Sequence, residues 1–229
     1  MKNILTLTMV GGLALGAWGG QTVNPSLAVN AAVPDGNPVG ISSSLTVGGL
    51  SGDIATVQVS LDITGGYNGD LYAYLTGPQG QVAVLLNRSG VSGSNPFGYD
   101  NPGFNITLSD ISANNIHDYQ AVNYSLDPVT GQLTGMWAPD GRNLDPQSDG
   151  SAFDSAPETS AALGSLAGTS ADGTWTLFVA DLSGGGQSTL VSWGLTVVTV
   201  PEPRAWTMLG SGLLLLMWIA KIRNRPNLK

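Results

Sequence analysis

The sequence predicts an all-β protein, an antiparallel β-sandwich, because three features of its pattern agree. Apolar and polar residues alternate over stretches of four to eight residues, which is typical of strands that are buried on one face. Glycine and proline, 32 and 13 of the 229 residues, gather between these stretches, where turns are needed. No long segment shows the 3.6-residue period of a helix, and many short strands with glycine-rich turns favour a sandwich.

The alternation is clearest in five stretches of the chain. They cover residues 57–63, 71–75, 82–86, 175–179 and 193–197. The segments that separate them have turn composition, for example Gly65-Gly66, Asn68-Gly69 and Gly184-Gly185-Gly186. One helical turn is expected, at residues 161–166. The folded domain is therefore expected over residues 41–199.

The N-terminus has the layout of a secretory signal peptide. Lys2 precedes an apolar run from Ile4 to Ala17, and Ser26-Leu27-Ala28 offers small side chains around a cleavage site. We expect residues 1–28 to be this signal peptide and residues 29–40 to be a linker.

The C-terminus has a different layout, with sixteen uncharged residues from Ala205 to Ala220. As a helix this run spans about 24 Å, short of the ~30 Å hydrocarbon core of a bilayer, and Lys221 can extend the span by about one turn. The basic tail that follows, Lys221, Arg223 and Arg225, favours a cytoplasmic end by the positive-inside rule. The sequence therefore predicts a transmembrane helix over 205–220 with the domain outside. A buried core helix is the alternative, and the cations after the run argue against it.

A short motif precedes this helix: Val200, Pro201, Glu202 and Pro203. A Pro-Glu-Pro motif, an apolar helix and a basic end, in this order over residues 200–229, resemble the PEP-CTERM sorting signal of Gram-negative bacteria. The resemblance implies processing by an exosortase-like membrane enzyme and a transient stay at the inner membrane. Proline also keeps the backbone of such a site extended and accessible.

Two sets of motifs in the middle of the chain resemble the proprotein-convertase P domain (P/Homo B). The first is Gly69-Asp70-Leu71 with Leu75-Thr76-Gly77-Pro78-Gln79-Gly80; the second is Gly173-Thr174-Trp175 with Asp181 and Ser192-Trp193-Gly194. The resemblance covers residues 41–199 and implies a jelly-roll sandwich of about eight strands. The chain departs from the family at Gly65-Gly66-Tyr67 and over the Asp-rich stretch 100–160.

The motif residues also have physical roles of their own. Asp70 follows a tight-turn dipeptide, so its carboxylate is expected to cap backbone amides or to bind a cation. Trp175 and Trp193 each begin an alternating strand and are expected to fill the space between the sheets. Tyr72 and Tyr74 face away from this core, on an exposed face or in a patch that stacks on carbohydrate.

Composition excludes several classes of function. Residues 29–200 contain two basic and fifteen acidic residues, a net charge of −13, which is the wrong sign for binding nucleic acid. The chain has no cysteine, which excludes disulfides and thiolate sites, and His117 is its only histidine. A serine triad or a metal hydrolase site is hard to build from one histidine.

Calcium is the cofactor that this composition suits, because it takes carboxylate, amide and carbonyl oxygens. Four acidic residues of one region are the candidate ligands: Asp100, Asp140, Asp145 and Asp149. A merely solvated acidic loop explains them equally well.

Together these features predict an exported, non-enzymatic protein of the cell surface or extracellular matrix. Its expected partners are the processing enzyme, the inner membrane during sorting, and an extracellular polysaccharide or surface protein. Two alternatives stay open: an accessory domain in a subtilisin-like protease system, and a glycoside hydrolase that uses an Asp pair.

Overall fold

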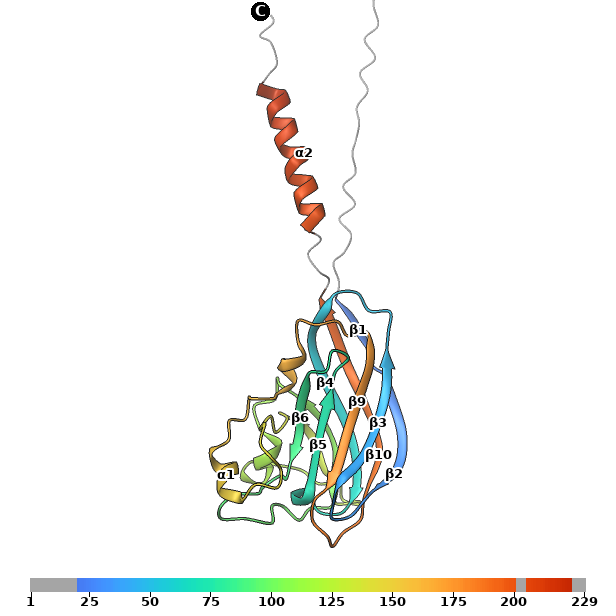
Figure 1. The fold of residues 1–229 in the computed structure, drawn as a ribbon, viewed down its shortest axis with the longest axis vertical. Coiled ribbons are helices and arrows are strands. Elements are labelled where there is room, and N and C mark those ends of the chain that lie inside the picture. Colours follow the sequence, from blue (N-terminus) through green and yellow to red (C-terminus); the bar gives the residue numbers. More distant parts are fainter. Residues whose placement is uncertain (1–19, 201–204, 224–229) are drawn as a thin grey trace, which may run out of the picture.

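The chain folds into two β-sheets packed face to face (Figure 1). The computed structural model describes residues 20–200 and the helix at 205–223, with side chains of that helix given for 212–221. The strands of the described part are β1 (Gln21–Val23), β2 (Ser26–Val33), β3 (Asn37–Val47), β4 (Asp53–Gly65), β5 (Leu71–Thr76), β6 (Val82–Asn87), β7 (Gly103–Ser109), β8 (Leu133–Trp137), β9 (Gly173–Asp181) and β10 (Ser188–Val200). The β-sandwich is confirmed.

The larger sheet has the order β1-β10-β4-β7-β8, with β2 also paired to β10, and the smaller sheet has the order β3-β9-β5-β6. Every pairing is antiparallel except that of β7 with β8, which is parallel. The expectation of a purely antiparallel sandwich was wrong at this point. Parallel neighbours need a long crossover, and residues 110–132, with the 3-10 helix η2 (Ile116–Ala121), supply it.

The core lies between the sheets and is built from the inward residues of the alternating strands. Along β4, the residues Val57, Val59, Leu61 and Ile63 are all buried, as the period of two requires. β10 pairs with β4 over almost its whole length, from Ser188 opposite Gly65 to Val200 opposite Asp53. This long ladder is the main strand pairing of the larger sheet.

The period of two fails at β6, where residues 83–87 are all buried although Val82 is exposed. The reason is that irregular chain covers this edge strand on its outer side. The amides of Asp140 and Gly141 bond to the carbonyls of Leu85 and Val84, and Val84 donates to Ala161. Covering an edge in this way satisfies its free backbone groups.

The chain between β7 and β9 is mostly irregular and gathers beside β6 (Figure 1). It contains η2, the short helix α1 (Gly150–Ser155) and the 3-10 turn η3 (Leu163–Leu166). The helical turn expected at 161–166 is present as η3. The helix α1 was not predicted; the Asp149 carboxylate caps it by accepting from the amides of Ser151 and Ala152.

The N-terminal boundary differs from the expectation. Residues 29–40 are not a linker, because they form most of β2 and the start of β3. β1 and β2 pair with β10, and Val23 and Leu27 pack against the core. A cleavage after Ala28 would cut through β2. Most of the expected signal peptide, residues 1–19, lies outside the described residues.

The C-terminal segment forms helix α2 (Ala205–Arg223), so the helical expectation is confirmed. The apolar side chains from Leu213 to Ile219 are exposed, which rules out the alternative of a buried core helix. Within the described residues, no helix is long and apolar enough to cross a membrane. The transmembrane helix expected at 205–220 is therefore not shown.

Removal of residues 1–28 is expected to destabilise the sandwich by about 2–4 kcal/mol relative to removal of residues 1–19. The longer deletion takes away the partly buried Val23 and Leu27 and leaves one edge of β10 unpaired from Ser192 to Thr199. Urea unfolding of the two shortened chains measures the difference. Equal midpoints and slopes would show that β1 and the start of β2 contribute nothing.

Candidate functional site

The two motif tryptophans lie in the core. Trp175 on β9 and Trp193 on β10 are almost fully buried, one from each sheet. The Trp193 indole donates to the Ser43 hydroxyl of β3 across the sandwich at 2.9 Å, and Trp175 donates to the Ala171 carbonyl at 3.0 Å. Both polar tips are therefore satisfied inside the protein, and both rings hold the sheets together.

The two motif aspartates come together at one end of the sandwich. Asp70 ends η1 (Asn68–Asp70) just before β5, and Asp181 ends β9, whose register places it opposite Leu71. The Asp181 carboxylate is fully buried and accepts from the Ser188 hydroxyl at 3.1 Å. Burial raises the pKa of Asp181 to about 6; the negative charge of nearby Asp70 adds to this rise, and the Ser188 hydrogen bond opposes it only in part.

The four expected calcium ligands have separate local roles. Asp140 is buried in an ion-pair network, while Asp145 accepts from the Gln147 amide and Asp149 caps α1. Asp100 is exposed on another loop. Among the described residues, no group of three or more acidic or histidine side chains is arranged to hold a metal ion. The structure does not bring this set together.

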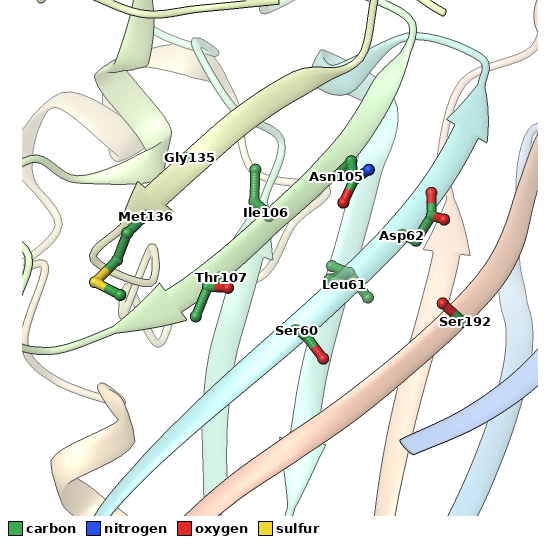
Figure 2. A pocket seen from close by; sticks show the side chains of 9 residues that line it. All are labelled: Ser60, Leu61, Asp62, Asn105, Ile106, Thr107, Gly135, Met136 and Ser192. Atoms are coloured by element: carbon green, nitrogen blue, oxygen red, sulfur yellow. The ribbon is translucent and has the colours of Figure 1, made fainter. Parts of the chain in front are cut away.

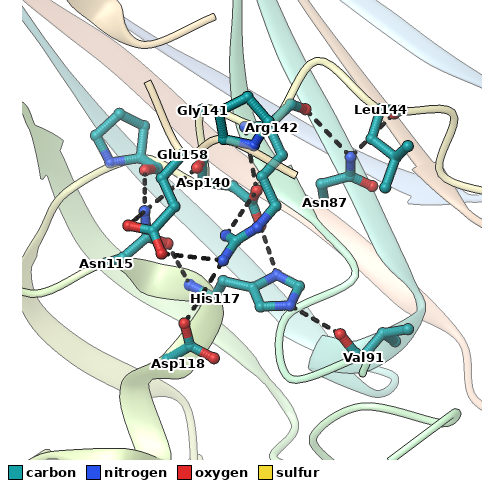
Figure 3. Close-up of polar contacts among 12 residues, drawn as sticks. Asn87, Val91, Asn115, His117, Asp118, Asp140, Gly141, Arg142, Leu144 and Glu158 are labelled. Atoms are coloured by element: carbon teal, nitrogen blue, oxygen red, sulfur yellow. Dashed lines mark hydrogen bonds and ion pairs between the residues drawn. The ribbon is translucent and has the colours of Figure 1, made fainter. Parts of the chain in front are cut away.

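Sequence reasoning missed a buried polar network around His117 (Figure 3). The His117 Nδ1 lies 2.7 Å from Asp140 Oδ2, and Arg142 Nη1 lies 3.3 Å from the other oxygen of that carboxylate. Arg142 also pairs with Glu158 at 3.1 Å, and Asp118 lies at 3.7 Å. The network joins η2, the chain at 140–142 and the chain at 158, which lie far apart in the sequence.

The two ring nitrogens of His117 are both occupied. Nε2 lies 2.9 Å from the Val91 carbonyl, so it must donate there, and Nδ1 then donates to the Asp140 carboxylate. Burial by itself lowers the pKa of His117, but the hydrogen bond and charge of Asp140 outweigh it, and the pKa is raised. A histidine that is buried, charged and doubly bonded is a structural group and a poor general base.

Three aromatic side chains share the outer face of the smaller sheet. Tyr74 stacks on Phe178 with ring centroids 4.8 Å apart, and Tyr72 meets both rings edge-on or tilted. Each ring is half-buried by its neighbours. Their faces are therefore largely used against one another.

The outer face of the larger sheet carries a shallow polar trough (Figure 2). It has a volume of about 380 Å³ and spans β10, β4, β7 and β8. The register places Ser192, Asp62 and Asn105 in one row across three strands. The next row contains Thr107 opposite Ser60, with Met136 beyond it on β8.

The trough is rich in hydrogen-bonding side chains of small size. Hydroxyl, amide and carboxylate groups that follow one another about 4.8 Å apart within each row can bond to a chain of sugar hydroxyls. The alternation in β4 and β7 predicts which residues face outward. The alignment of these residues into rows depends on strand register, which the sequence pattern does not reveal.

Most residues of the expected sorting signal lie outside the described residues. Val200 is the exposed last residue of β10. Pro201, Glu202, Pro203 and Arg225 lie outside the described residues. Lys221 is exposed on α2, and Arg223 ends that helix.

Asp140→Asn is expected to lower the free energy of unfolding by about 3–5 kcal/mol, because it removes the buried carboxylate that pairs with both His117 and Arg142. The raised pKa of His117 also makes the contribution of this network to stability depend on pH. Its stabilisation is complete below about pH 6.5 and is lost as the pH rises through the folded-state pKa. Urea unfolding at several pH values should show this decline in the wild type only.

The matched control is Asp118→Asn, which removes the half-exposed neighbour of Arg142 and is expected to cost at most about 1 kcal/mol. Equal losses from both variants would contradict the central role of Asp140.

Asp181→Asn is expected to remove a pH dependence of the free energy of unfolding between about pH 4 and 6. Since the folded-state pKa of about 6 lies above the usual 3.8, the folded chain binds a proton that the unfolded chain releases. Stability therefore falls as the pH rises through this window, by at most about 3 kcal/mol. Unfolding curves between pH 4 and 7 should be flatter for the variant, and an unchanged slope would refute the assignment.

Comparison with known proteins identifies part of the chain. Residues 54–137 match the family model described as the proprotein convertase P-domain. A stretch of 77 residues is 42% identical to leupeptin-inactivating enzyme 1 of Streptomyces exfoliatus, covering 33% of this chain and 17% of that protein.

Two solved structures are also similar, the serine protease of Aeromonas sobria alone and in complex with its chaperone (ORF2). Both have a TM-score of 0.40, at 17% and 18% identity, and cover 78% and 79% of this chain but only 27% of theirs. This chain thus spans less than a third of the length of the proteins that it matches. The resemblance of the motifs around Asp70 to the P-domain is confirmed: residues 54–137 match the proprotein convertase P-domain family.

Proposed function

We propose that this protein is an exported, non-enzymatic module that binds polysaccharide in the extracellular matrix or at the cell surface. The observation that carries the proposal is the polar trough on the outer face of the larger sheet. Its outward side chains lie on paired strands, so their spacing is fixed before a ligand arrives. An extended, neutral or hydroxyl-rich polymer fits an open trough of this kind.

The non-enzymatic part of the proposal rests on His117. Its ring nitrogens both serve the fold, and its side chain is buried. A glycoside hydrolase remains the alternative among enzymes, because it needs only two carboxylates. The trough contains one, Asp62, and its Oδ1 accepts from the Gln132 amide at 2.8 Å.

Export and sorting complete the proposal. The leader ends before β1, so that the strands paired with β10 survive cleavage. The Pro-Glu-Pro segment and α2 act as the sorting signal for an exosortase-like enzyme. The exposed apolar side chains of α2 support a role outside the sandwich, because such a surface requires a membrane or a protein partner.

The second candidate is an accessory domain in a proteolytic system. The P-domain match favours it, since the similar proteins include serine proteases of which this chain covers only a part. A pull-down from the native secretome distinguishes the two candidates. Enrichment of a protease, without retention on polysaccharide, would favour the accessory role.

Asn105→Ala combined with Thr107→Ala is expected to weaken polysaccharide binding about tenfold, because it removes two outward hydrogen-bonding groups from the trough. The assay is co-sedimentation of the full chain with the exopolysaccharide of its source, with calcium and again with EDTA. Loss in EDTA would add a calcium requirement to the proposal.

Thr56→Ala is the matched control, since it changes an exposed outward residue of β4 outside the trough lining. If the double variant is retained on the polysaccharide as well as the wild type is, the polysaccharide binds elsewhere on the protein. No retention under either condition would overturn direct polysaccharide binding.

A further inference from the structure

A second cavity, which the proposed function does not use, lies where β5 begins and β9 ends. Figure 1 shows these two strand ends at one end of the sandwich. It has a volume of about 340 Å³. Its lining includes three aromatic side chains and two carboxylates: Tyr67, Phe97, Tyr99, Asp70 and Asp100. Aromatic faces beside carboxylates are the groups that proteins use to hold an organic cation.

Asp70 is the central group of this cavity. Its side chain is only 7% exposed, yet within residues 20–200 no cation lies within 4.0 Å of its carboxylate. Burial is the main cause that raises the pKa of Asp70, and the Ser183 hydroxyl and the more distant charge of Arg88 offset it only in part. A buried carboxylate of this kind gains from a positively charged ligand.

The nearest cation is committed to the backbone. Arg88 donates from Nε to the Gly69 carbonyl at 3.2 Å and from Nη2 to the Pro96 carbonyl at 3.4 Å. It therefore ties η1 to the loop that carries Phe97 and Tyr99. Arg88 and Arg142 are the two basic residues between positions 29 and 200, so the protein supplies no other partner for Asp70 there.

The walls of the cavity are held in place without a ligand. The Gly69 amide bonds to the Tyr99 carbonyl at 2.8 Å, and a Cβ on Gly69 would lie 2.8 Å from the Cα of Gly98. This close approach, with Gly98 at a φ of +70°, requires glycine at both positions. Tyr99 also packs edge-on against Tyr119, with ring centroids 4.6 Å apart.

Most charges around the cavity are negative. Asp35 accepts from the Gly185 amide beside the cavity, and Asp181 lies behind Asp70. With a net charge of −13 over residues 29–200, the domain attracts cations and repels anions. A cavity of this volume has room for one long basic side chain.

We propose that this cavity is a binding site for the guanidinium or alkylammonium group of a basic side chain on a polypeptide partner. Asp70 and Asp100 neutralise the cation, and the rings of Tyr67, Phe97 and Tyr99 enclose its stem. The site is independent of the polar trough, so either one can fail without the other.

The test is a ligand-observed NMR titration of the full chain with Nα-acetyl-arginine amide, Nα-acetyl-lysine amide and the uncharged isostere Nα-acetyl-citrulline amide. We expect saturable binding of at least one cation and at least tenfold weaker binding of citrulline. Asp70→Asn and Phe97→Ala should each weaken cation binding at least fivefold. Phe97 is 81% exposed, so its variant keeps the fold even where Asp70→Asn does not.

Asp53→Asn is the matched control, because it removes the same charge at the other end of the sandwich, beside Val200. It should leave binding unchanged. Equal weakening by Asp53→Asn and Asp70→Asn would show that the overall negative charge of the domain alone attracts the cation, and it would overturn the site. Equal binding of citrulline, displacement of the cation by a neutral oligosaccharide or by calcium, or no binding at all would also overturn it.

Discussion

The ladder between β10 and β4 is the constraint on which the rest of this structure depends. Both strands have thirteen residues, and they pair from Ser188 to Val200 with two register shifts. Residues that point inward along this ladder, such as Trp193, close the core, and those that point outward form the polar trough. Register thus builds the hydrophobic core and the candidate binding surface by the same pairing.

The ladder also separates the two ends of the domain. β10 starts next to the cavity around Asp70 and ends at Val200, at the C-terminal end of the domain. Thirteen extended residues span about 40 Å. A partner held in the cavity would therefore meet the end of the sandwich that is remote from the C-terminal connection.

A different interaction organises the irregular half of the protein. The network of His117, Asp140 and Arg142 joins segments that share no regular secondary structure, and it lies against covered strand β6. Buried charges contribute stability only when they are paired and hydrogen-bonded. Here one carboxylate serves two cations, so its position fixes both η2 and the chain at 142.

The sequence was sufficient to predict those strands whose pattern can be read from neighbouring residues along the chain. β4, β5, β9 and β10 each have one buried face, so alternation located them, and the two core tryptophans followed from it. Alternation located β6 as well, but it did not predict that residues 83–87 are all buried, because the irregular chain that covers this edge strand is distant in the sequence. β1 and β2 were assigned to a leader and a linker, since a short strand at a sheet edge has little pattern of its own.

The candidate sites depend on contacts between distant residues, and no spacing rule exposes these. Asp140 looked like a calcium ligand because it is one of several nearby aspartates, but the fold pairs it with a histidine 23 positions away. Asp70 was singled out from a turn motif, whereas its environment depends on the approach of Gly98 to Gly69. The chemistry of an acidic residue in this protein is therefore set by what covers it: Asp140 is buried with cations, and Asp70 is buried facing an aromatic cavity without one.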